Sequence, residues 1–454
     1  MVNFLRMIFD FIILIGIIVF FHEGGHFLFF RFMNVKILEF SLGFGPKIYQ
    51  KKIGKDQTLL TIRLLPLGGY VKPLEKNNIS DKQFQQLSLE DQNRVFENLQ
   101  RWKKMAIVFA GPLFNFILSF LVFVIMFFIV GESGFAPKIS YVYPNSPFYQ
   151  SGIQKGDTIE SINHQKVFFE NEAYLLLIKN LLNHQSVVIQ TQNHHTYHIN
   201  LQKVNLNHQI DKNMGFEFEG PEGKIMVEKI HKNSVAFQNK ILPKDIIVAL
   251  NHQKINDLNL FIRFLRNDNH QKSILLTINR NQQTKDISLI PAIKYEDGKK
   301  IGYIGVDLKV VQPINQKIEK KYSFVQSITI ATQKLIDYTK ITLISLKDLL
   351  VGKISMNNLS GPVSMVKYSA QSAHGGLFTY LNMLAVISIS IGIFNLLPIP
   401  LLDGGHLLQY IIESIRQKDF SLLEMRISQT IGLLSIMLIF SISMINDLLK
   451  WIHF

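Results

Sequence analysis

The chain has 454 residues, a net charge of +14 and no cysteine. With 47% hydrophobic residues, 35 phenylalanines and only 18% charged residues, it is too apolar to be disordered. The absence of cysteine excludes disulfides, thiolate zinc sites, iron–sulfur clusters and a cysteine nucleophile, so any metal has to be held by His, Asp or Glu. The positive charge by itself fits either nucleic acid or anionic lipid.

Four long apolar stretches predict transmembrane helices. Uncharged runs cover Met105–Val130, Leu377–Leu402 and Ile427–Ile445, and about 20 apolar residues are enough to cross roughly 30 Å of hydrocarbon. The fourth stretch, Met7–Phe30, contains Asp10 and the cluster HEGGH. We interpret it as a retained helix, because it continues through FLFFRF without the small-residue cleavage site of a signal peptide.

Lys and Arg in the short connections predict the orientation of these helices. Residues 31–104, between the first two spans, contain 14 Lys and Arg, whereas the N-terminal flank contains only Arg6. The connection between the last two spans adds Arg416, Lys418 and Arg426. Both connections are therefore expected in the cytoplasm and both termini outside. Much of the positive charge then lies beside the bilayer, which favours a lipid partner and argues against nucleic acid.

A repeat marks the long segment between the second and third spans. The stretch Ser146–Lys166 returns as Ser234–Lys254, with INHQK matched by LNHQK. The first copy resembles a segment of PDZ domains, in which an extended peptide adds to a sheet edge. Two PDZ-like recognition or gating domains are therefore expected outside the membrane.

The two copies differ at two turn positions. Lys240 and Lys244 stand where the first copy has Gly152 and Gly156. Glycine adopts left-handed backbone conformations without a steric penalty, and lysine does not. The substitution places the turn geometry of the second copy, and with it a peptide groove, in question.

Two further segments have patterns of their own. Tyr322–Val351 is apolar with a helical period but carries several charges, which favours a surface-lying amphipathic helix over a fifth span. Within Val35–Lys72, the runs FSLGFGPKIYQ, LLTIRLL and PLGGYV read as short strands with glycine turns. They predict a small sheet close to the inner face of the membrane.

The cluster HEGGH has the spacing of a metal site. His22 and His26 are four residues apart and share one face of a helix, and Glu23 lies beside them to act on a metal-bound water. The alternative is a pair of core histidines. Ionisable residues inside an apolar span cost about 2.5 to 3.5 kcal/mol each on insertion scales and usually mark functional sites, which favours the metal.

A catalytic zinc normally takes three protein ligands, so the chain must supply one more. The best candidate is Asp403 in NLLPIPLLDGGH, since the first and third spans run in the same direction and both motifs lie late in their spans. Pro398 and Pro400 are expected to break the helix just before it. Glu413 and His406 are rivals farther along the chain.

Taken together, HEGGH, AGPLFNF, PLGGYVK, LSGPVSM, NLLPIP and LDGG resemble the motifs of the site-2 protease family of intramembrane zinc metalloproteases. The resemblance covers nearly the whole chain. It implies zinc bound by His22, His26 and Asp403, with Glu23 as the general base. It further implies that Asn395 and a strand edge contact an unwound substrate; the residues of the sheet concerned are Gly43, Gly45, Gly68 and Gly69.

The resemblance also implies a location and substrates. The chain is expected in a bacterial inner membrane, with its termini and PDZ-like domains in the periplasm and its active site near the cytoplasmic face. Its substrates would be single-pass membrane proteins, namely an anti-sigma factor of a stress response and remnant signal peptides, cut after a first cleavage outside the membrane. A catalytically dead scaffold would usually lack Glu23 or a ligand, and a transporter would show inverted repeats.

The sequence thus predicts a polytopic α-helical membrane protein with four transmembrane helices, a small membrane-associated β-sheet and two PDZ-like α+β domains outside. The expected segments, in chain order, are a first transmembrane helix with the zinc motif (1–34), a β region (35–75), a cytoplasmic amphipathic segment (76–103), a second transmembrane helix (104–131), PDZ-like domains at 132–214 and 215–310, an amphipathic connector (311–375), a third transmembrane helix (376–403), a cytoplasmic loop (404–426) and a fourth transmembrane helix (427–449).

Overall fold

The computed structural model describes residues 2–75, 84–85, 87–183, 185–201, 204, 214–219, 222–267, 272–296, 299–311, 318–354, 356 and 359–452. The chain divides into two units. One consists of residues 1–132 and 321–454, and the other of residues 133–320. The first unit holds the HEGGH and LDGG motifs, and the second holds both copies of the repeat.

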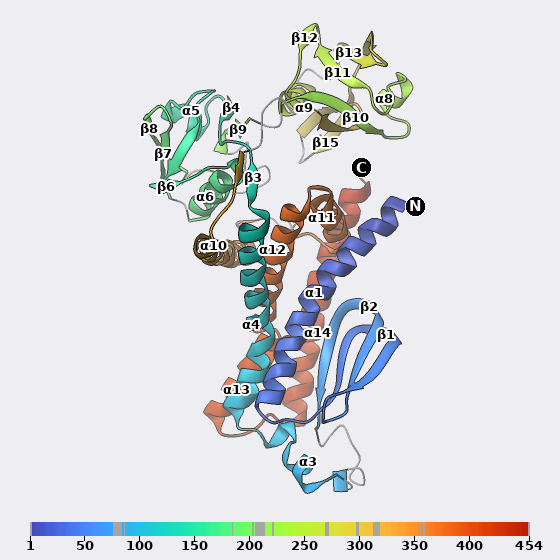
Figure 1. The fold of residues 1–454 in the computed structure, drawn as a ribbon, viewed down its shortest axis with the longest axis vertical. Coiled ribbons are helices and arrows are strands. Elements are labelled where there is room, and N and C mark those ends of the chain that lie inside the picture. Colours follow the sequence, from blue (N-terminus) through green and yellow to red (C-terminus); the bar gives the residue numbers. More distant parts are fainter. Residues whose placement is uncertain are drawn as a thin grey trace. The chain divides into compact units, whose positions relative to one another are not determined.

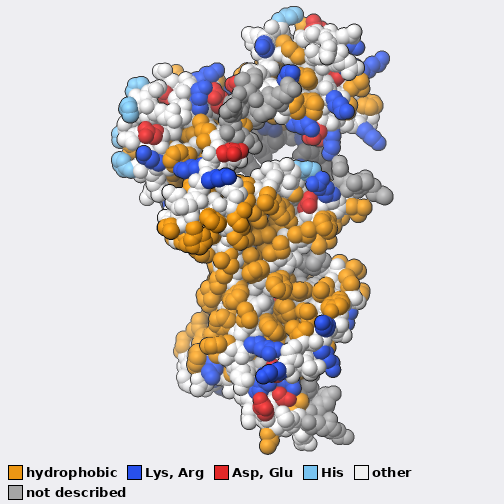
Figure 2. Space-filling view, in the orientation of Figure 1, with side chains coloured by type: hydrophobic (Ala, Val, Ile, Leu, Met, Phe, Trp, Pro, Cys, Tyr) orange, Lys and Arg blue, Asp and Glu red, His pale blue; other side chains and the backbone are white. Residues whose placement is uncertain are grey.

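Four helices of the first unit are long and apolar enough to cross a membrane, which confirms the four predicted apolar helices. They are α1 (Val2–Phe32), α4 (Arg101–Ile125, continued by a π-helical turn at Met126–Val130), α12 (Leu377–Asn395) and α14 (Leu422–Ile452). Figure 1 shows the N- and C-termini at the same end of this unit. Figure 2 shows apolar side chains over its middle and charged ones gathered at the end that holds α3 (Leu89–Asn93).

Helices α1, α4 and α12 form the packed centre of the first unit. Leu14, Ile18, Phe123 and Ile389 are fully buried where the three helices meet. In a membrane, lipid tails are as apolar as these side chains, so helix association depends on close packing and on hydrogen bonds between helices. One such bond joins the Ser119 hydroxyl of α4 to the Ala385 carbonyl oxygen of α12, at 2.9 Å.

The contact between α1 and α4 depends on glycine. A Cβ atom on Gly25 would lie 2.4 Å from the backbone oxygen of Ala110, a distance that real Cβ atoms do not show. Gly111 on α4 faces the two histidines of HEGGH, and a Cβ there would lie 2.3 Å from His26 Nε2. Gly24, the other glycine of the motif, has open space where a Cβ would stand. Two of these three glycines thus allow the helices to approach.

The third span ends earlier than the sequence predicts. Helix α12 stops at Asn395, whereas the predicted span extends to residue 403. Pro398 and Pro400 are the physical reason, since proline lacks the N–H that would continue the helix and restricts the residue before it. The chain then crosses to a new helix that begins at Asp403.

The prediction of a loop at 404–426 is wrong, because α13 (Asp403–Arg416) occupies more than half of this segment. The apolar residues of HLLQYIIESI recur with the period of a helix, and this pattern indicates α13. The last span is also longer than predicted, since α14 covers Leu422–Ile452. Between the repeat and the third span lie α10 (Phe324–Leu350), which confirms the helix predicted at Tyr322–Val351, and α11 (Pro362–His374).

The amphipathic segment predicted at 76–103 falls partly outside the described residues. In the described part, Phe84 and Gln85 are helical, and the five-residue α3 and a 3-10 turn at Phe96–Asn98 precede α4.

The small sheet predicted near HEGGH is present, but it consists of two long strands instead of several short ones. They are β1 (Ile37–Ile53) and β2 (Thr58–Pro73), which pair antiparallel. Glu39 of β1 pairs with both Leu59 and Lys72, so the first half of β1 lies between the two halves of β2. Figure 1 shows this sheet beside α1.

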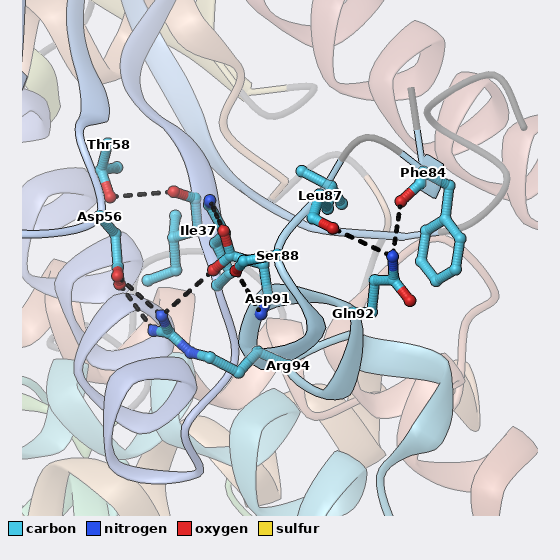
Figure 3. Close-up of polar contacts among 10 residues, drawn as sticks. Ile37, Asp56, Thr58, Phe84, Leu87, Ser88, Asp91, Gln92 and Arg94 are labelled. Atoms are coloured by element: carbon cyan, nitrogen blue, oxygen red, sulfur yellow. Dashed lines mark hydrogen bonds and ion pairs between the residues drawn. The ribbon is translucent and has the colours of Figure 1, made fainter. Parts of the chain in front are cut away.

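An ion-pair network fixes the turn of the sheet to the segment before α4 (Figure 3). The Arg94 guanidinium donates to both carboxylate oxygens of Asp56, at 2.8 and 2.7 Å. Lys36 donates to Asp91 of α3, and the Ser88 hydroxyl caps that helix. The hydrogen bond with Arg94 holds the pKa of Asp56 below its usual range.

The first copy of the repeat folds into short strands and helices. They are β3 (Glu132–Gly134), β4 (Ile139–Val142), α5 (Pro147–Ser151), β5 (Ile159–Ile162), β6 (Gln165–Lys166), α6 (Glu170–Leu182), β7 (Val187–Thr191), β8 (Thr196–Ile199) and β9 (Phe216–Phe218). One sheet has the order β6-β5-β7-β8, and β4 pairs with β9. Because β9 belongs with β4, this fold continues past residue 214, where the first domain was predicted to end.

The second copy has the same kinds of element. They are β10 (Lys224–Ile230), α8 (Val235–Gln238), β11 (Ile246–Leu250), β12 (Gln253–Lys254), α9 (Leu258–Asn267), β13 (Ile274–Arg280), β14 (Gln283–Leu289), β15 (Ala292–Glu296), β16 (Lys299–Tyr303) and β17 (Val306–Val311). A last strand, β18 (Ile318–Lys320), pairs with β3. Ser146 and Ser234 occupy corresponding N-caps, and their hydroxyls donate to the carbonyl oxygens of Gly215 and Gly305. The closing strands, β9 and β17, therefore also correspond.

The turn of the second copy keeps the geometry of the first. Lys240 and Lys244 have φ angles of 58° and 76°, close to the 84° and 96° of Gly152 and Gly156. The left-handed conformation costs a non-glycine residue roughly 1 kcal/mol or more. The lysines therefore adopt the glycine conformation at an energetic cost. The replacement of glycine by lysine does not change the geometry of this turn.

The two glycines of HEGGH provide a matched test of the α1–α4 contact. We expect Gly25→Ala to lower the free energy of unfolding by about 1 to 3 kcal/mol, because the methyl group meets backbone that cannot move aside. We expect Gly24→Ala to be neutral or to stabilise by up to about 1 kcal/mol, since alanine is the better helix former. Thermal unfolding of both variants in detergent would check this, and equal melting temperatures would contradict it.

Candidate metal centre

The two histidines of HEGGH lie one turn apart on α1, with their rings toward the same side. The ring centroids are 5.0 Å apart and the planes meet at 84°. Both imidazoles are largely buried, with about one eighth of each side chain exposed. The helix therefore presents two nitrogen ligands to one point, as the spacing predicts.

The second nitrogen of each ring contacts α4. His26 Nδ1 lies 2.9 Å from the backbone oxygen of Ile107. A carbonyl oxygen can only accept a hydrogen bond, so Nδ1 carries the proton and Nε2 keeps its lone pair. His22 Nδ1 lies 3.2 Å from the side-chain amide of Asn115. Each ring is thus held by its own partner on α4.

The structure brings Asp403 to the same point from a different helix. Its carboxylate oxygens lie 3.2 Å from His22 Nε2 and 3.5 Å from His26 Nε2. Its carboxylate thus faces the ring nitrogen of each histidine that is not turned toward α4.

The broken helix determines where Asp403 lies. Leu401 has a φ angle of 82°, a strained conformation for a branched side chain, and α13 begins two residues later at Asp403. A Cβ on Gly404 would lie 2.2 Å from the Leu396 oxygen, and one on Gly405 would lie 2.3 Å from the Ile399 oxygen. The two glycines of LDGG thus allow the chain to fold tightly back on itself, which turns Asp403 inward.

These three side chains fit a metal ion. One nitrogen or oxygen atom from each of His22, His26 and Asp403 lies within 4.8 Å of the others. Two ligands of a tetrahedral zinc are about 3.3 Å apart at Zn–N distances of 2.0 to 2.1 Å, close to the two separations that Asp403 makes. Asp403 Oδ2 is buried and accepts no hydrogen bond in the described part of the chain. A cation would satisfy it.

Glu23 lies in the same cavity, on the side of the sheet. A Cβ on Gly69 of β2 would lie 2.7 Å from Glu23 Cγ, so the absence of a side chain at Gly69 leaves the room that Glu23 occupies. The cavity has a volume of about 920 Å³ and is lined by both residues and by the three candidate ligands. Apolar side chains of α1, α11 and α14 line other parts of its wall.

The remaining candidates for substrate contact differ in where they lie. Gly68, Gly69 and Asn395 line the cavity, whereas Gly43 and Gly45 are not among its lining residues. Asn395 ends α12, and its side-chain nitrogen lies 3.5 Å from His22 Nε2. Gly43 has a φ of 90°, and a Cβ there would lie 2.6 Å from the Leu65 oxygen. Glycine at that position shapes the sheet.

The rivals for the third ligand take other positions. His406 lines the cavity one helical turn after Asp403, and burial lowers its pKa. It is not part of the group of three whose ligand atoms converge among the described residues. Glu413 is buried near the end of α13, where its carboxylate accepts hydrogen bonds from the Gln409 side chain and the Phe420 N–H.

Sequence reasoning assigned no role to three residues that shape this region. Gly111 and Asn115 come from AGPLFNF, a motif that was noted without a function. Arg63 of β2 contacts the Ser41 hydroxyl, the Gly45 carbonyl and the Tyr70 hydroxyl at 2.8 to 3.0 Å, so it ties the glycine turn to the strand that lines the cavity. An arginine inside an otherwise apolar strand, LLTIRLL, was the available signal.

Comparisons with known proteins identify the family of the chain. The model of Peptidase family M50 matches residues 10–439. The Regulator of sigma-E protease RseP of Escherichia coli is 31% identical over 98% of this chain and 99% of its own length. A putative zinc metalloprotease of Vibrio cholerae is 31% identical over 96% of this chain and 97% of its own length, and one of Xylella fastidiosa is 29% identical over 98% and 99%.

The third ligand is tested by Asp403→Asn. We expect this variant to contain markedly less zinc per chain than the wild type, because the amide loses the charge that a cation needs. His406→Asn is the matched control, one turn along the same helix, and it should keep the wild-type zinc content. Elemental analysis of both purified variants provides the measurement. If only the His406 variant lost zinc, the assignment of Asp403 would be reversed.

Proposed function

Because the chain belongs to Peptidase family M50 and is a zinc metalloprotease of the membrane, we propose that it cuts transmembrane segments at the cavity where α1 and α13 meet. We propose His22, His26 and Asp403 as the zinc ligands and Glu23 as the general base. The observation that carries this is the convergence of three largely buried ligand side chains, contributed by two different helices, beside Glu23 in one cavity.

The residues of the cavity divide the chemistry between them. When bound, zinc supplies Lewis acidity and lowers the pKa of water toward neutrality. Glu23 takes a proton from the attacking water at its carboxylate and passes it to the leaving amide nitrogen. Asn395, beside the ligands, is placed to donate a hydrogen bond to the substrate. The Ile107 carbonyl holds the His26 ring in the orientation that the metal requires.

The substrate is proposed to bind as an extended strand. A helical segment hides its carbonyl groups in hydrogen bonds and must unwind before it can be cut, and in a membrane the freed backbone groups need new partners. In the described part of the chain, Gly69–Pro73 of β2 pairs with β1 on one side only. Its other edge is proposed to pair with the unwound substrate. Gly69 contributes no side chain there, so the strand approaches Glu23 closely.

We propose that the termini and the second unit lie in the periplasm and that the cavity opens near the cytoplasmic face of a bacterial inner membrane. The support is the excess of Lys and Arg at 31–104 and at Arg416–Arg426. Both termini lie at the same end of the helical unit in Figure 1, as expected for a chain that crosses a membrane an even number of times.

We propose an anti-sigma factor and remnant signal peptides as substrates, after a first cleavage outside the membrane. A relative over nearly the whole chain bears the name Regulator of sigma-E protease, which supports a role in the regulation of a sigma factor. The two copies of the repeat are proposed to be PDZ-like domains that act as a size filter. Since both keep the same turn geometry, the loss of glycines gives no reason to assign peptide recognition mainly to the first copy.

The role of Glu23 is tested by Glu23→Gln. The amide keeps the size of the side chain and leaves the three ligands intact, but it cannot take the proton. We expect cleavage of a transmembrane substrate to fall by at least about 100-fold, while zinc per chain stays at the wild-type value. Cleavage near the wild-type rate, with zinc bound, would exclude Glu23 as the base.

The filter is tested by removing residues 133–320. The ends of this excision are close, since the Tyr322 hydroxyl donates to Glu132 at 3.1 Å, so a short Gly/Ser linker can join them. We expect the shortened protease to cut both a full-length substrate and its trimmed form, whereas the complete chain cuts only the trimmed form. The same deletion carrying Glu23→Gln is the control for other proteases. Full-length substrate that stays intact while the trimmed form is cut would contradict the filter.

A further inference from the structure

We infer that Asn115 is a positioning residue that fixes the tautomer of His22, so that His22 Nε2 is free to bind the metal. This inference rests on the proposed function of His22 as a ligand. It concerns the side of the imidazole that faces away from the metal, where Asn115 Nδ2 lies 3.2 Å from His22 Nδ1.

Asn115 is held rigidly in the centre of the bundle. Asn115 is fully buried on α4. Its backbone oxygen accepts hydrogen bonds from the hydroxyls of Ser119 and Ser388, at 2.8 and 2.9 Å. Gly392 of α12 lies against it, since a Cβ there would be 3.3 Å from Asn115 Cβ. The backbone and the Cβ atom of Asn115 are therefore held between α4 and α12. The two ends of its amide are distinguished by the hydrogen bonds that each makes.

The amide oxygen of Asn115 is buried without a hydrogen-bond partner in the described part of the chain. The nitrogen, in contrast, faces a ring nitrogen. Oxygen and nitrogen of an amide have nearly the same size, and their placement is assigned from the hydrogen bonds that each makes. Turning the amide by half a turn brings the oxygen to His22 Nδ1 and gives it a donor.

The two orientations have opposite consequences for His22. A neutral imidazole has one N–H and one lone pair. If the amide nitrogen donates to Nδ1, the proton of the ring lies on Nε2, and that nitrogen has no lone pair for a metal. If the amide oxygen accepts from Nδ1–H, the lone pair lies on Nε2, which faces Asp403 at 3.2 Å. A metal-binding His22 therefore requires the oxygen of Asn115 at Nδ1.

The two histidines then have equivalent support from α4. The Ile107 carbonyl oxygen performs this function for His26, where only one tautomer is possible. Ile107, Gly111 and Asn115 recur at intervals of four residues and so share one face of the helix. Gly111 leaves room for the rings, and a carbonyl oxygen on either side of it receives one ring N–H. The AGPLFNF motif thereby gains a chemical reason for its asparagine.

The test compares three substitutions in a Glu23→Gln background, in which zinc binding is measured without turnover. Asn115→Leu keeps the size of the side chain but removes the acceptor. Asn115→Asp keeps an acceptor at the same position. Ser369→Ala on α11 is the control, because it removes a buried hydroxyl whose hydrogen bond, to the Val366 carbonyl oxygen, involves neither Asn115 nor His22. Zinc affinity is measured by competition with a chromophoric chelator, and folding by thermal unfolding of the metal-free protein.

We expect Asn115→Leu to bind zinc about 10- to 100-fold more weakly, the usual effect of losing a group that orients a ligand. Asn115→Asp and Ser369→Ala should bind within about threefold of the parent. With cobalt in place of zinc, the visible spectrum of the leucine variant should change, since one ligand is lost or reoriented.

Unchanged affinity in a folded Asn115→Leu protein would overturn the inference. If the leucine variant does not fold, the aspartate variant decides, and an affinity as low as that of an alanine at His22 would overturn it equally. A different result would contradict the proposed function. If the parent protein bound no zinc, or if a His22→Ala variant bound zinc as tightly as the parent, His22 would not be a zinc ligand.

Discussion

The direct approach of α1 to α4 is the constraint on which the site depends. At Gly25 and Gly111 the two helices leave no room for a side chain, and the imidazoles of His22 and His26 fill the space that remains. In a bilayer, polar groups inside the bundle have no water to pair with, so each must find a partner in the protein. The backbone at Ile107 and the amide of Asn115 lie within reach only because the helices approach this closely.

The position of Asp403, the third proposed ligand, depends on the interruption between α12 and α13. Two prolines end α12, and the chain between Leu396 and Leu402 folds against its own backbone with glycines at 404 and 405. Gly432 of α14 also lies against this turn, since a Cβ there would be 2.0 Å from the Pro400 oxygen. The strained φ of Leu401 persists because the surrounding packing fixes it. The cost of the strain is offset by packing elsewhere, and the result is a carboxylate directed at two imidazoles.

In the second unit, a turn keeps its left-handed backbone conformation although glycine is replaced by lysine. Two lysines occupy left-handed positions that glycines occupy in the other copy, and the serine caps of both copies donate to equivalent glycine carbonyls. The hydrogen bonds and the buried strands around the turn specify its path, so the side chains adopt the conformation at a cost of roughly 1 kcal/mol each. Substitution of a turn glycine therefore does not by itself show that a fold has changed.

The sequence by itself determined the four apolar helices and the pair of histidines on one helix face, because hydropathy and helical spacing are local properties of the chain. Asp403 was predicted less directly, from the matching depth of two motifs in parallel spans and from the family resemblance. It also indicated the sheet beside HEGGH, but not that β1 would lie between two halves of β2, since strand register depends on partners distant in sequence. It could not locate α13, or assign roles to Gly111, Asn115 and Arg63, whose partners lie on other elements. What the tertiary structure alone decided is which groups meet in the cavity, because convergence of side chains from separate helices depends on how closely their backbones approach.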